Sequence, residues 1–158
     1  MSDLRSQFSN LQLLIIGDGP ERGRLEQKIK LLSLENIVKC TGGMPKGKLF
    51  KYLCAADLFV LNTDYEGFSH QIIEAMASGA PVITTRIGGN PEIITHEKDG
   101  LLIDRNDPNA LKAAIQKLLM DEKMRITLAA AGKERAKQFS PEPMLMSLKM
   151  ILDQVCGS

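Results

Sequence analysis

The feature of this sequence that most constrains its fold is a regular alternation of short apolar runs with segments of helical spacing. Apolar runs occur at residues 11–16, 37–41, 58–61, 81–84 and 101–103. Between the first two of them, Leu25, Ile29 and Leu32 recur every three to four positions, as on one face of a helix. Strands that are apolar on both faces are typical of parallel sheets covered by helices. The alternation therefore predicts an α/β fold with a parallel sheet.

The last third of the chain is predicted to be helical. Asn90 and Asp107 each stand before a proline, and this pairing is typical of a capping side chain followed by the first helical position. Helical spacing continues from Asn109, over residues 123–137, and again from Ser140. No linker, internal repeat or low-complexity run separates these segments, so the 158 residues are predicted to form a single domain.

The charge balance and the hydropathy pattern argue against two classes of partner. Twenty Lys and Arg against nineteen Asp and Glu leave a formal charge of +1, which gives no general field to attract nucleic acid or an anionic bilayer. No apolar run approaches the roughly eighteen residues that a membrane-spanning helix needs. We therefore expect neither a nucleic-acid partner nor a membrane span, and any anion must be bound locally.

The cysteines indicate a reducing compartment. Cys40, Cys54 and Cys156 are an odd number at wide spacing, and the first ten residues are polar rather than signal-like. A cytoplasmic location is expected. The sequence contains no CxxC pair and no Cys/His cluster at ligand spacing, so no metal site is predicted.

The segment with the most chemistry lies between two glutamates, Glu66 and Glu74, which follow the predicted strand at 58–61. The carboxyl end of a parallel strand is where such sheets bind ligands. If Glu66 lies in the loop and Glu74 about two turns into the next helix, both can face one crevice. The residues between them, Gly67 to Ser69, would supply N–H groups at a helix amino terminus, which suit a diphosphate.

A simpler interpretation is that Glu66 only caps a helix and Glu74 only faces solvent, and two arbitrary glutamates favour it. The neighbours of Glu74 argue otherwise here. The run from Ile72 to Ala77 is otherwise wholly apolar, and an unpaired carboxylate is costly to bury in such surroundings. A ligand-binding role for the pair is therefore the better interpretation.

Glu66 and Glu74 are separated by seven residues, and further motifs stand around them in a fixed order. These are Gly17-Asp18-Gly19-Pro20-Glu21, Ala55-Ala56-Asp57, the run from Glu74 to Ile83, Gly88-Gly89-Asn90-Pro91-Glu92 and Gly100-Leu101-Leu102. In this order and spacing the sequence resembles the family-four (group 1) glycosyltransferases of the GT-B superfamily. The match is to their C-terminal, donor-binding domain, and it covers nearly the whole chain.

The resemblance implies a Rossmann-like donor domain that binds a nucleoside-diphosphate sugar, UDP-sugar or GDP-sugar, for hexosyl transfer with retained configuration. It implies that Glu66 is the catalytic-site residue beside the donor sugar ring, and that Glu74 binds the ribose hydroxyls. The loop over the sugar and diphosphate is implied to be Gly67, Phe68 and Ser69, with His70 inside it. His70 is explained equally well as a residue that only starts a helix.

The resemblance further implies that the turn at Gly42 and Gly43 contacts the base through main-chain groups. It implies no metal ion and no cofactor other than the donor substrate.

The start of the chain departs from the family pattern. The family's first strand and helix, whose turn carries an Arg and a Lys for the diphosphate, have no counterpart, and Arg5 is not assigned to that role. The acceptor domain is also absent from the sequence. We expect two strand edges without their shared partner, binding of UDP weaker than roughly 10 μM, and a need for an N-terminal acceptor-binding domain or a second chain.

Three other functions are weighed against this one. The chain could be a non-catalytic nucleotide-sugar-binding or regulatory subunit, or a fragment of a larger enzyme. It could be a nucleotide-sugar epimerase of the same superfamily, although the segment from Glu66 to Glu74 is not expected there in this form. A dinucleotide site is disfavoured, because after Gly17 and Gly19 the third position of the fingerprint holds Arg22, and glycine comes only at 23.

Overall fold

The structure is a computed structural model that describes residues 1–139. These residues belong to two compact units, Met1–Leu49 and Phe50–Ser158, and each unit is considered by itself. The helix predicted to start at Ser140 lies outside the described residues. The single-domain organisation stays a prediction.

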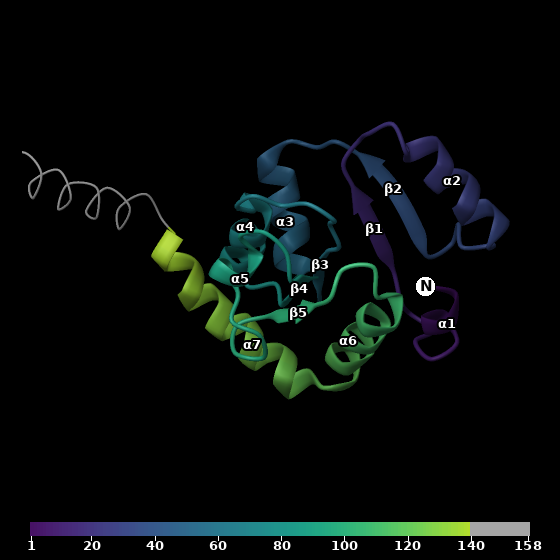
Figure 1. The fold of residues 1–158 in the computed structure, drawn as a ribbon. Helices are drawn as coiled ribbons and strands as arrows, with labels where there is room; N and C mark the ends of the chain where they lie inside the picture. The colour runs from purple at the N-terminus through teal and green to yellow at the C-terminus, as the bar shows by residue number, and fades with distance from the viewer. Residues whose placement is uncertain (140–158) are drawn as a thin grey trace, which may run out of the picture. The chain divides into compact units, whose positions relative to one another are not determined.

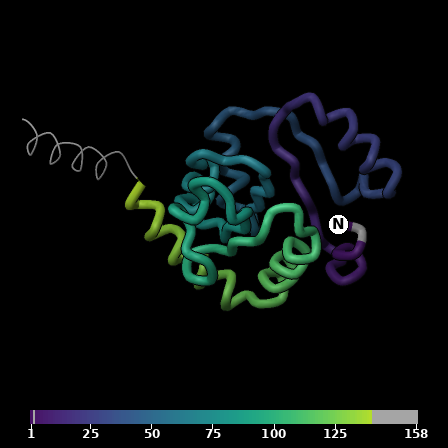
Figure 2. The backbone as a smooth tube through the Cα atoms, in the orientation of Figure 1, coloured from purple at the N-terminus to yellow at the C-terminus, as the bar shows by residue number. Residues whose placement is uncertain are grey.

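The first unit is built on a pair of parallel strands. Its elements are α1 (Ser2–Arg5), β1 (Leu13–Ile16), α2 (Arg22–Leu31) and β2 (Val38–Gly42), and α3 (Lys46–Ala55) begins at its end. Figure 2 lets the backbone be followed from α1 through β1 and α2 to β2, which runs beside β1. Leu13 stands opposite Val38, and the register shifts by one residue between Ile15 and Ile16.

The second unit holds a three-stranded parallel sheet in the order β3-β4-β5. Its elements are β3 (Phe59–Leu61), α4 (His70–Ser78), β4 (Val82–Thr85), α5 (Asn90–Ile93), β5 (Leu101–Ile103), α6 (Pro108–Met120), α7 (Glu122–Ala136) and the short 3₁₀ helix η1 (Lys137–Phe139). Figure 1 shows α4, α6 and α7 around this sheet, and all three contact β4. The predicted alternation of strands and helices is confirmed.

Burial explains why β4 and β5 carry no charged residue. All four residues of β4 are buried, and all three of β5. Ile83, Leu101 and Ile103 of these strands form a core cluster with Ala114 and Leu118 of α6 and Leu128 of α7. A strand in the middle of such a sheet meets a helix on each face, so alternation with polar residues is lost.

Each sheet has an edge strand without a neighbour in the described part of its unit. β1 pairs only with β2 in the first unit, and β3 pairs only with β4 in the second. Large apolar side chains on these strands, Leu14 and Val60, are exposed. β2 and β5 are outer strands as well, so the expectation of two strand edges without their shared partner stays a prediction.

The two predicted helix caps turn out differently. Asp107 caps α6 as predicted, because its Oδ1 accepts hydrogen bonds from the N–H groups of Asn109 and Ala110 at 3.0 and 2.8 Å. The predicted cap at Asn90 is wrong. The cap residue of α5 is Gly89, without a side-chain bond, and Asn90 is the first residue of the helix. Its side chain is fully buried instead.

In residues 1–139 we find no helix with the length and apolar character that crossing a bilayer requires.

Candidate functional site

Two loops follow neighbouring strands of the second unit and lead into helices. The first joins β3 to α4 and contains Glu66, and the second joins β4 to α5 and contains Gly88 and Gly89. Because β3 and β4 are parallel, both loops leave the same edge of the sheet. This edge is where the sequence predicts the donor site.

The two loops touch through their backbones. The N–H of Gly89 donates a hydrogen bond to the carbonyl oxygen of Gly67 at 2.8 Å. A Cβ on Gly88 would lie 1.7 Å from the carbonyl oxygen of Glu66, and a Cβ on Gly89 would lie 2.1 Å from that of Gly67. Gly88 also has φ +49°, a conformation that favours glycine. The two glycines therefore let this turn hold the backbone of Glu66 and Gly67 in place.

A buried polar network ties the ends of β3 and β4 together beneath these loops. The hydroxyl of Thr84 donates to the carbonyl of Leu61, and the hydroxyl of Thr85 to that of Thr63, both at 2.8 Å. The amide of Asn90 donates to Thr84 Oγ1 at 3.1 Å and to Thr85 O at 3.0 Å. Asn90 is fully buried. These bonds explain why Asn90 does not cap α5.

The network was missed in the sequence analysis. Its local signal is the pair of threonines that ends an otherwise apolar strand, since a buried hydroxyl needs a hydrogen-bond partner. The partners themselves lie on β3, its following loop and α5, and no local pattern specifies them.

The helix that follows the first loop begins one residue after Ser69. Ser69 is buried and extended, and its side chain makes no capping bond to α4. The first N–H groups of a helix lack partners within the helix and carry a partial positive charge. In α4 they therefore stay available to an anion at the site predicted for the diphosphate.

Both predicted glutamates lie in the second unit and are half-buried. Glu66 is in the loop before α4. Glu74 is the fifth residue of α4, so it stands little more than one turn into the helix, and the prediction of about two turns is wrong. The reason is that the loop extends up to Ser69, which shortens the helical part of the segment. Glu74 then lies about 6 Å along the axis from His70.

Two aromatic side chains at the end of this loop, Phe68 and His70, are exposed. Phe68 is 43% exposed, and its ring stands edge-on to the ring of His70 at 6.1 Å between centroids. It also stands edge-on to Phe139 of η1 at 5.7 Å. His70 is exposed at the start of α4.

The predicted base-binding residues, Gly42 and Gly43, lie in the first unit. Gly42 ends β2 with φ +71°, and the place of its Cβ is 2.9 Å from Arg22 Nη1. Arg22 donates to Glu26 at 2.9 Å and lies 3.7 Å from Asp18. The hydrogen bond and the charge of Glu26, followed by the charge of Asp18, raise the pKa of Arg22 above its ordinary value. This cation beside the Gly42 turn was not predicted from the sequence.

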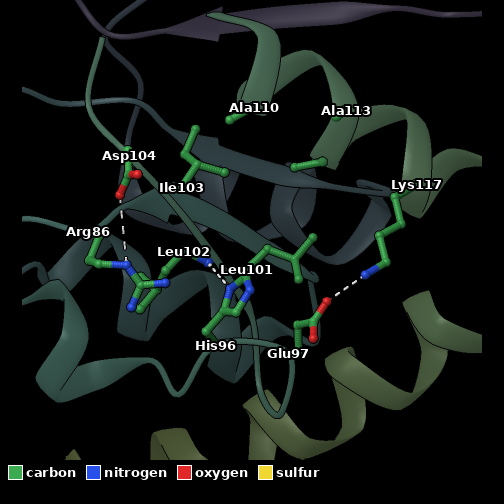
Figure 3. Close-up of a pocket in the computed structure, with 11 residues that line it drawn as sticks. Arg86, His96, Glu97, Leu101, Leu102, Ile103, Asp104, Ala110, Ala113 and Lys117 are labelled. Carbon is green, nitrogen blue, oxygen red and sulfur yellow. Dashed lines mark hydrogen bonds and ion pairs between the residues drawn. The ribbon is translucent and has the colours of Figure 1, made fainter. Parts of the chain in front are cut away.

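A cavity with a volume of about 410 Å³ lies elsewhere in the second unit, along β5 (Figure 3). Arg86 with Asp104 and Lys117 with Glu97 form ion pairs at its rim. His96 Nδ1 accepts a hydrogen bond from the N–H of Leu102 at 3.0 Å. None of the predicted donor residues lines this cavity.

The Lys117–Glu97 pair gives a pH-dependent contribution to stability. Its Nζ–Oε1 distance is 2.6 Å, and the hydrogen bond and charge of Lys117 lower the pKa of Glu97 below 4.5. A carboxyl group whose pKa is lower in the folded chain than in the unfolded chain stabilises the fold at a pH above its unfolded pKa. This stabilisation is lost as the pH falls through the folded pKa. We expect Lys117→Met to flatten the melting temperature against pH below about pH 4.5. Lys133→Met is the control, and an equal change in both variants would contradict the assignment.

Among residues 1–139, no group of three or more His, Cys, Asp or Glu side chains is arranged to hold a metal ion.

Comparison with known proteins supplies the family. The sequence profile described as Glycosyl transferases group 1 matches residues 1–135, most of the chain. The chain belongs to the group 1 glycosyl transferases. The resemblance seen in the motifs around Glu66 and Glu74 is therefore confirmed at the level of the family.

Relatives of this group 1 chain are named glycosyltransferases. The lipopolysaccharide core biosynthesis glycosyltransferase LpsD of Rhizobium meliloti is 37% identical over 128 residues, covering 81% of this chain and 37% of that protein. Sucrose-phosphate synthase from Thermosynechococcus elongatus has a TM-score of 0.85 at 32% identity, covering 99% of this chain and 41% of that one. HepE from Anabaena, solved with UDP and with UDP-glucose, has a TM-score of 0.86 for the UDP complex, at 26% identity over 97% of this chain and 44% of its own.

These comparisons confirm the α/β class, with parallel sheets flanked by helices, and the GT-B relationship of the group 1 chain. The chain spans between 37% and 44% of the length of these proteins.

Proposed function

We propose that this chain is the donor-binding part of a retaining glycosyltransferase. The bond between the anomeric carbon of a hexose and a nucleoside diphosphate would break, and the nucleoside diphosphate would leave with the electron pair. The oxygen of an acceptor hydroxyl would bond the anomeric carbon on the same face, and the proton of that hydroxyl would pass to the leaving phosphate oxygen. A UDP-sugar is the proposed donor, because HepE was solved with UDP and UDP-glucose. A GDP-sugar is the competing donor. The acceptor would be held by an N-terminal domain or a second chain.

The proposal assigns the sugar and the diphosphate to the loop before α4. Glu66 would accept hydrogen bonds from hydroxyls of the donor sugar. The N–H groups of Gly67, Phe68 and Ser69 would bind the diphosphate, whose charge the amino terminus of α4 favours. His70, exposed next to Phe68, is at the same end of the helix.

The nucleoside is assigned to two places. Glu74, one turn into α4, would accept hydrogen bonds from the ribose hydroxyls. Gly42 and Gly43 would contact the base through main-chain groups. No metal ion or separate cofactor is part of the proposal. The location proposed is the cytoplasm, which the free thiols of Cys40 and Cys54 support.

The observation that carries the proposal is the contact between the Gly88–Gly89 turn and the carbonyls of Glu66 and Gly67. It fixes a glycine-containing loop at the carboxyl edge of a parallel sheet, in front of an uncapped helix terminus. Donors that are held in position before the ligand arrives bind it at a lower entropic cost. A loop that only connects two elements would not require two glycines at positions where any Cβ would collide with the carbonyl oxygens of the neighbouring loop.

A titration calorimetry experiment tests the proposed ribose contact. We expect UDP to bind the chain and Glu74→Gln to weaken the binding about tenfold, because a carboxylate acceptor bonds roughly twice as strongly as a neutral one. UDP without the ribose 2′ and 3′ hydroxyls should bind the original chain and the variant with the same affinity. GDP and GDP-mannose, titrated alongside, identify the base.

Glu122→Gln is the matched control, since Glu122 is an acidic residue in the first turn of another helix, α7. It should leave the affinity for UDP unchanged. If neither UDP nor GDP binds at millimolar concentration, the proposed function is wrong. The nucleotide without the 2′ and 3′ hydroxyls could also bind Glu74→Gln about tenfold more weakly than it binds the original chain. In that case Glu74 does not bind those hydroxyls, and its assigned role is wrong.

A further inference from the structure

Arg135, in the last turn of α7, donates hydrogen bonds to the carbonyl groups at the carboxyl end of α5. Its Nη2 donates to the carbonyl of Glu92 at 2.7 Å, and its Nε donates to the carbonyl of Ile93 at 3.2 Å. These are the last two residues of α5. The last carbonyls of a helix lack partners within the helix, and the planar guanidinium can bond two of them at once.

The same guanidinium rests on an aromatic ring that reaches the donor loop. The Cζ of Arg135 lies 5.0 Å from the centroid of the Phe139 ring. Phe139 stands edge-on to Phe68 at 5.7 Å. Arg135 also donates to the side chain of Gln138, which orients the guanidinium. One side chain on α7 is thus connected to both loops of the candidate site.

The connection through α5 matters because this helix has only four residues. A single turn has too few internal hydrogen bonds to be stable by itself, so outside contacts must hold it. Asn90 holds its start through Thr84 and Thr85, and Arg135 holds its end. The start of α5 carries Gly89, whose N–H bonds the carbonyl of Gly67 at 2.8 Å. The placement of α5 therefore sets the placement of Gly67.

The connection through Phe139 acts on the next residue of the loop. Phe68 is partly exposed, and two of its ring contacts in the described structure are Phe139 and His70. Edge-to-face pairs of this kind contribute roughly 0.5–1.5 kcal/mol beyond burial. The N–H of Phe68 lies between those of Gly67 and Ser69, the groups assigned to the diphosphate.

We infer that Arg135 and Phe139 are positioning residues for the diphosphate of the nucleotide-sugar, acting through α5 and through Phe68. The inference rests on the proposed function, since it concerns the ligand of that same site. Neither residue touches the donor. They hold the N–H groups of residues 67–69 where the ligand requires them.

Arg125 offers a matched control on the same helix. It donates from Nη1 to the carbonyls of Leu118 and Leu119, near the end of α6, at 3.0 and 3.4 Å. The chemistry is the same as at Arg135, an arginine on carbonyls of a helix end, but α6 does not carry the loop. Arg125→Met and Arg135→Met should therefore lower the melting temperature by similar amounts.

Two measurements separate positioning from stability. In the ligand-free chain, hydrogen exchange followed by NMR should show the Gly89 amide exchanging about tenfold faster in Arg135→Met and unchanged in Arg125→Met. In calorimetry, UDP should bind Arg135→Met about tenfold more weakly and Arg125→Met with unchanged affinity. Arg135→Lys should recover part of the affinity, and Phe139→Leu should weaken UDP binding without affecting the bonds to Glu92 and Ile93.

Equal Gly89 exchange and equal UDP affinity in Arg135→Met and Arg125→Met would overturn the inference. Absence of UDP binding by the original chain would instead overturn the proposed function, and the Gly89 exchange would still decide whether Arg135 positions the loop. If Arg135→Met does not fold, Arg135→Lys and Phe139→Leu decide, because both keep most of the side-chain volume. Unchanged affinity in both of these variants would also overturn the inference.

Discussion

Replacing Gly89 with alanine is expected to abolish nucleotide binding while most of the fold persists. The new Cβ would lie 2.1 Å from the carbonyl oxygen of Gly67, far inside the roughly 3.5–4.0 Å of ordinary contact. The atom in the way belongs to the backbone, so the loop with Glu66 and Gly67 must move as a whole. We expect a loss of about 1–3 kcal/mol in the free energy of unfolding and no detectable binding of UDP.

Gly79→Ala is the control for this substitution. Gly79 ends α4 with φ +86°, and no atom lies within 4 Å of the place of its Cβ. Alanine there bears the cost of a left-handed conformation, roughly 1–2 kcal/mol, without a collision. Gly89 has φ −79°, so alanine there meets a collision without that conformational cost. UDP binding should be lost in Gly89→Ala and kept in Gly79→Ala, and the reverse result would contradict the role of the turn.

Replacing Asn90 with aspartate is expected to cause the largest loss of stability. The amide that donates to Thr84 Oγ1 and Thr85 O would become a carboxylate facing two acceptors in a fully buried place. Leaving a buried charge without a partner costs about 3–5 kcal/mol. Urea unfolding at pH 7 measures this loss, and Asn90→Ala, which removes the donors without adding a charge, should lose about 1–3 kcal/mol.

The pH dependence of the variant identifies the cause. Burial raises the pKa of the new carboxyl group above its unfolded value of about 3.9. A raised folded pKa means that the folded chain holds the proton more tightly, so the stability of Asn90→Asp should fall as the pH rises above about 3.9. Asn109→Asp, an exposed position at the start of α6, should change little. A pH-independent loss in Asn90→Asp would show that burial of charge is not the reason.

The element order of the second unit could be predicted because it follows from local patterns. Each apolar run became a strand within two residues of its predicted bounds, as 81–84 became Val82–Thr85. Asp107 was predicted as a cap and is one, because that bond involves only its next few residues. Asn90 has the same local pattern and is not a cap. Its direction is set by hydroxyl and carbonyl groups at the end of β4, which compete for the amide.

In the candidate site, too, some features follow from neighbouring residues and others only from the fold. The family could be identified from the spacing and the motifs around Glu66 and Glu74, and the family match confirms it, while the site assigned to this segment stays a prediction. The depth of Glu74 in α4 was misjudged, because a glycine-containing loop and the first turn of a helix have similar composition. Arg135 could not be assigned from the sequence, since it bonds backbone carbonyls of a segment that is remote along the chain. The nearness of Arg22 to the place of a Cβ on Gly42 likewise depends on the fold.

By itself the sequence determined the order of strands and helices, the apolar faces that they bury and the family to which the chain belongs. These depend on periodicity and on neighbouring residues, which a linear pattern records. Only the tertiary structure decided that the turn at Gly88 and Gly89 contacts the loop of Glu66, and that Arg135 bonds the carbonyls at the end of α5. Those contacts join residues more than twenty and more than forty positions apart. They exist only once the sheet has brought the strand ends together.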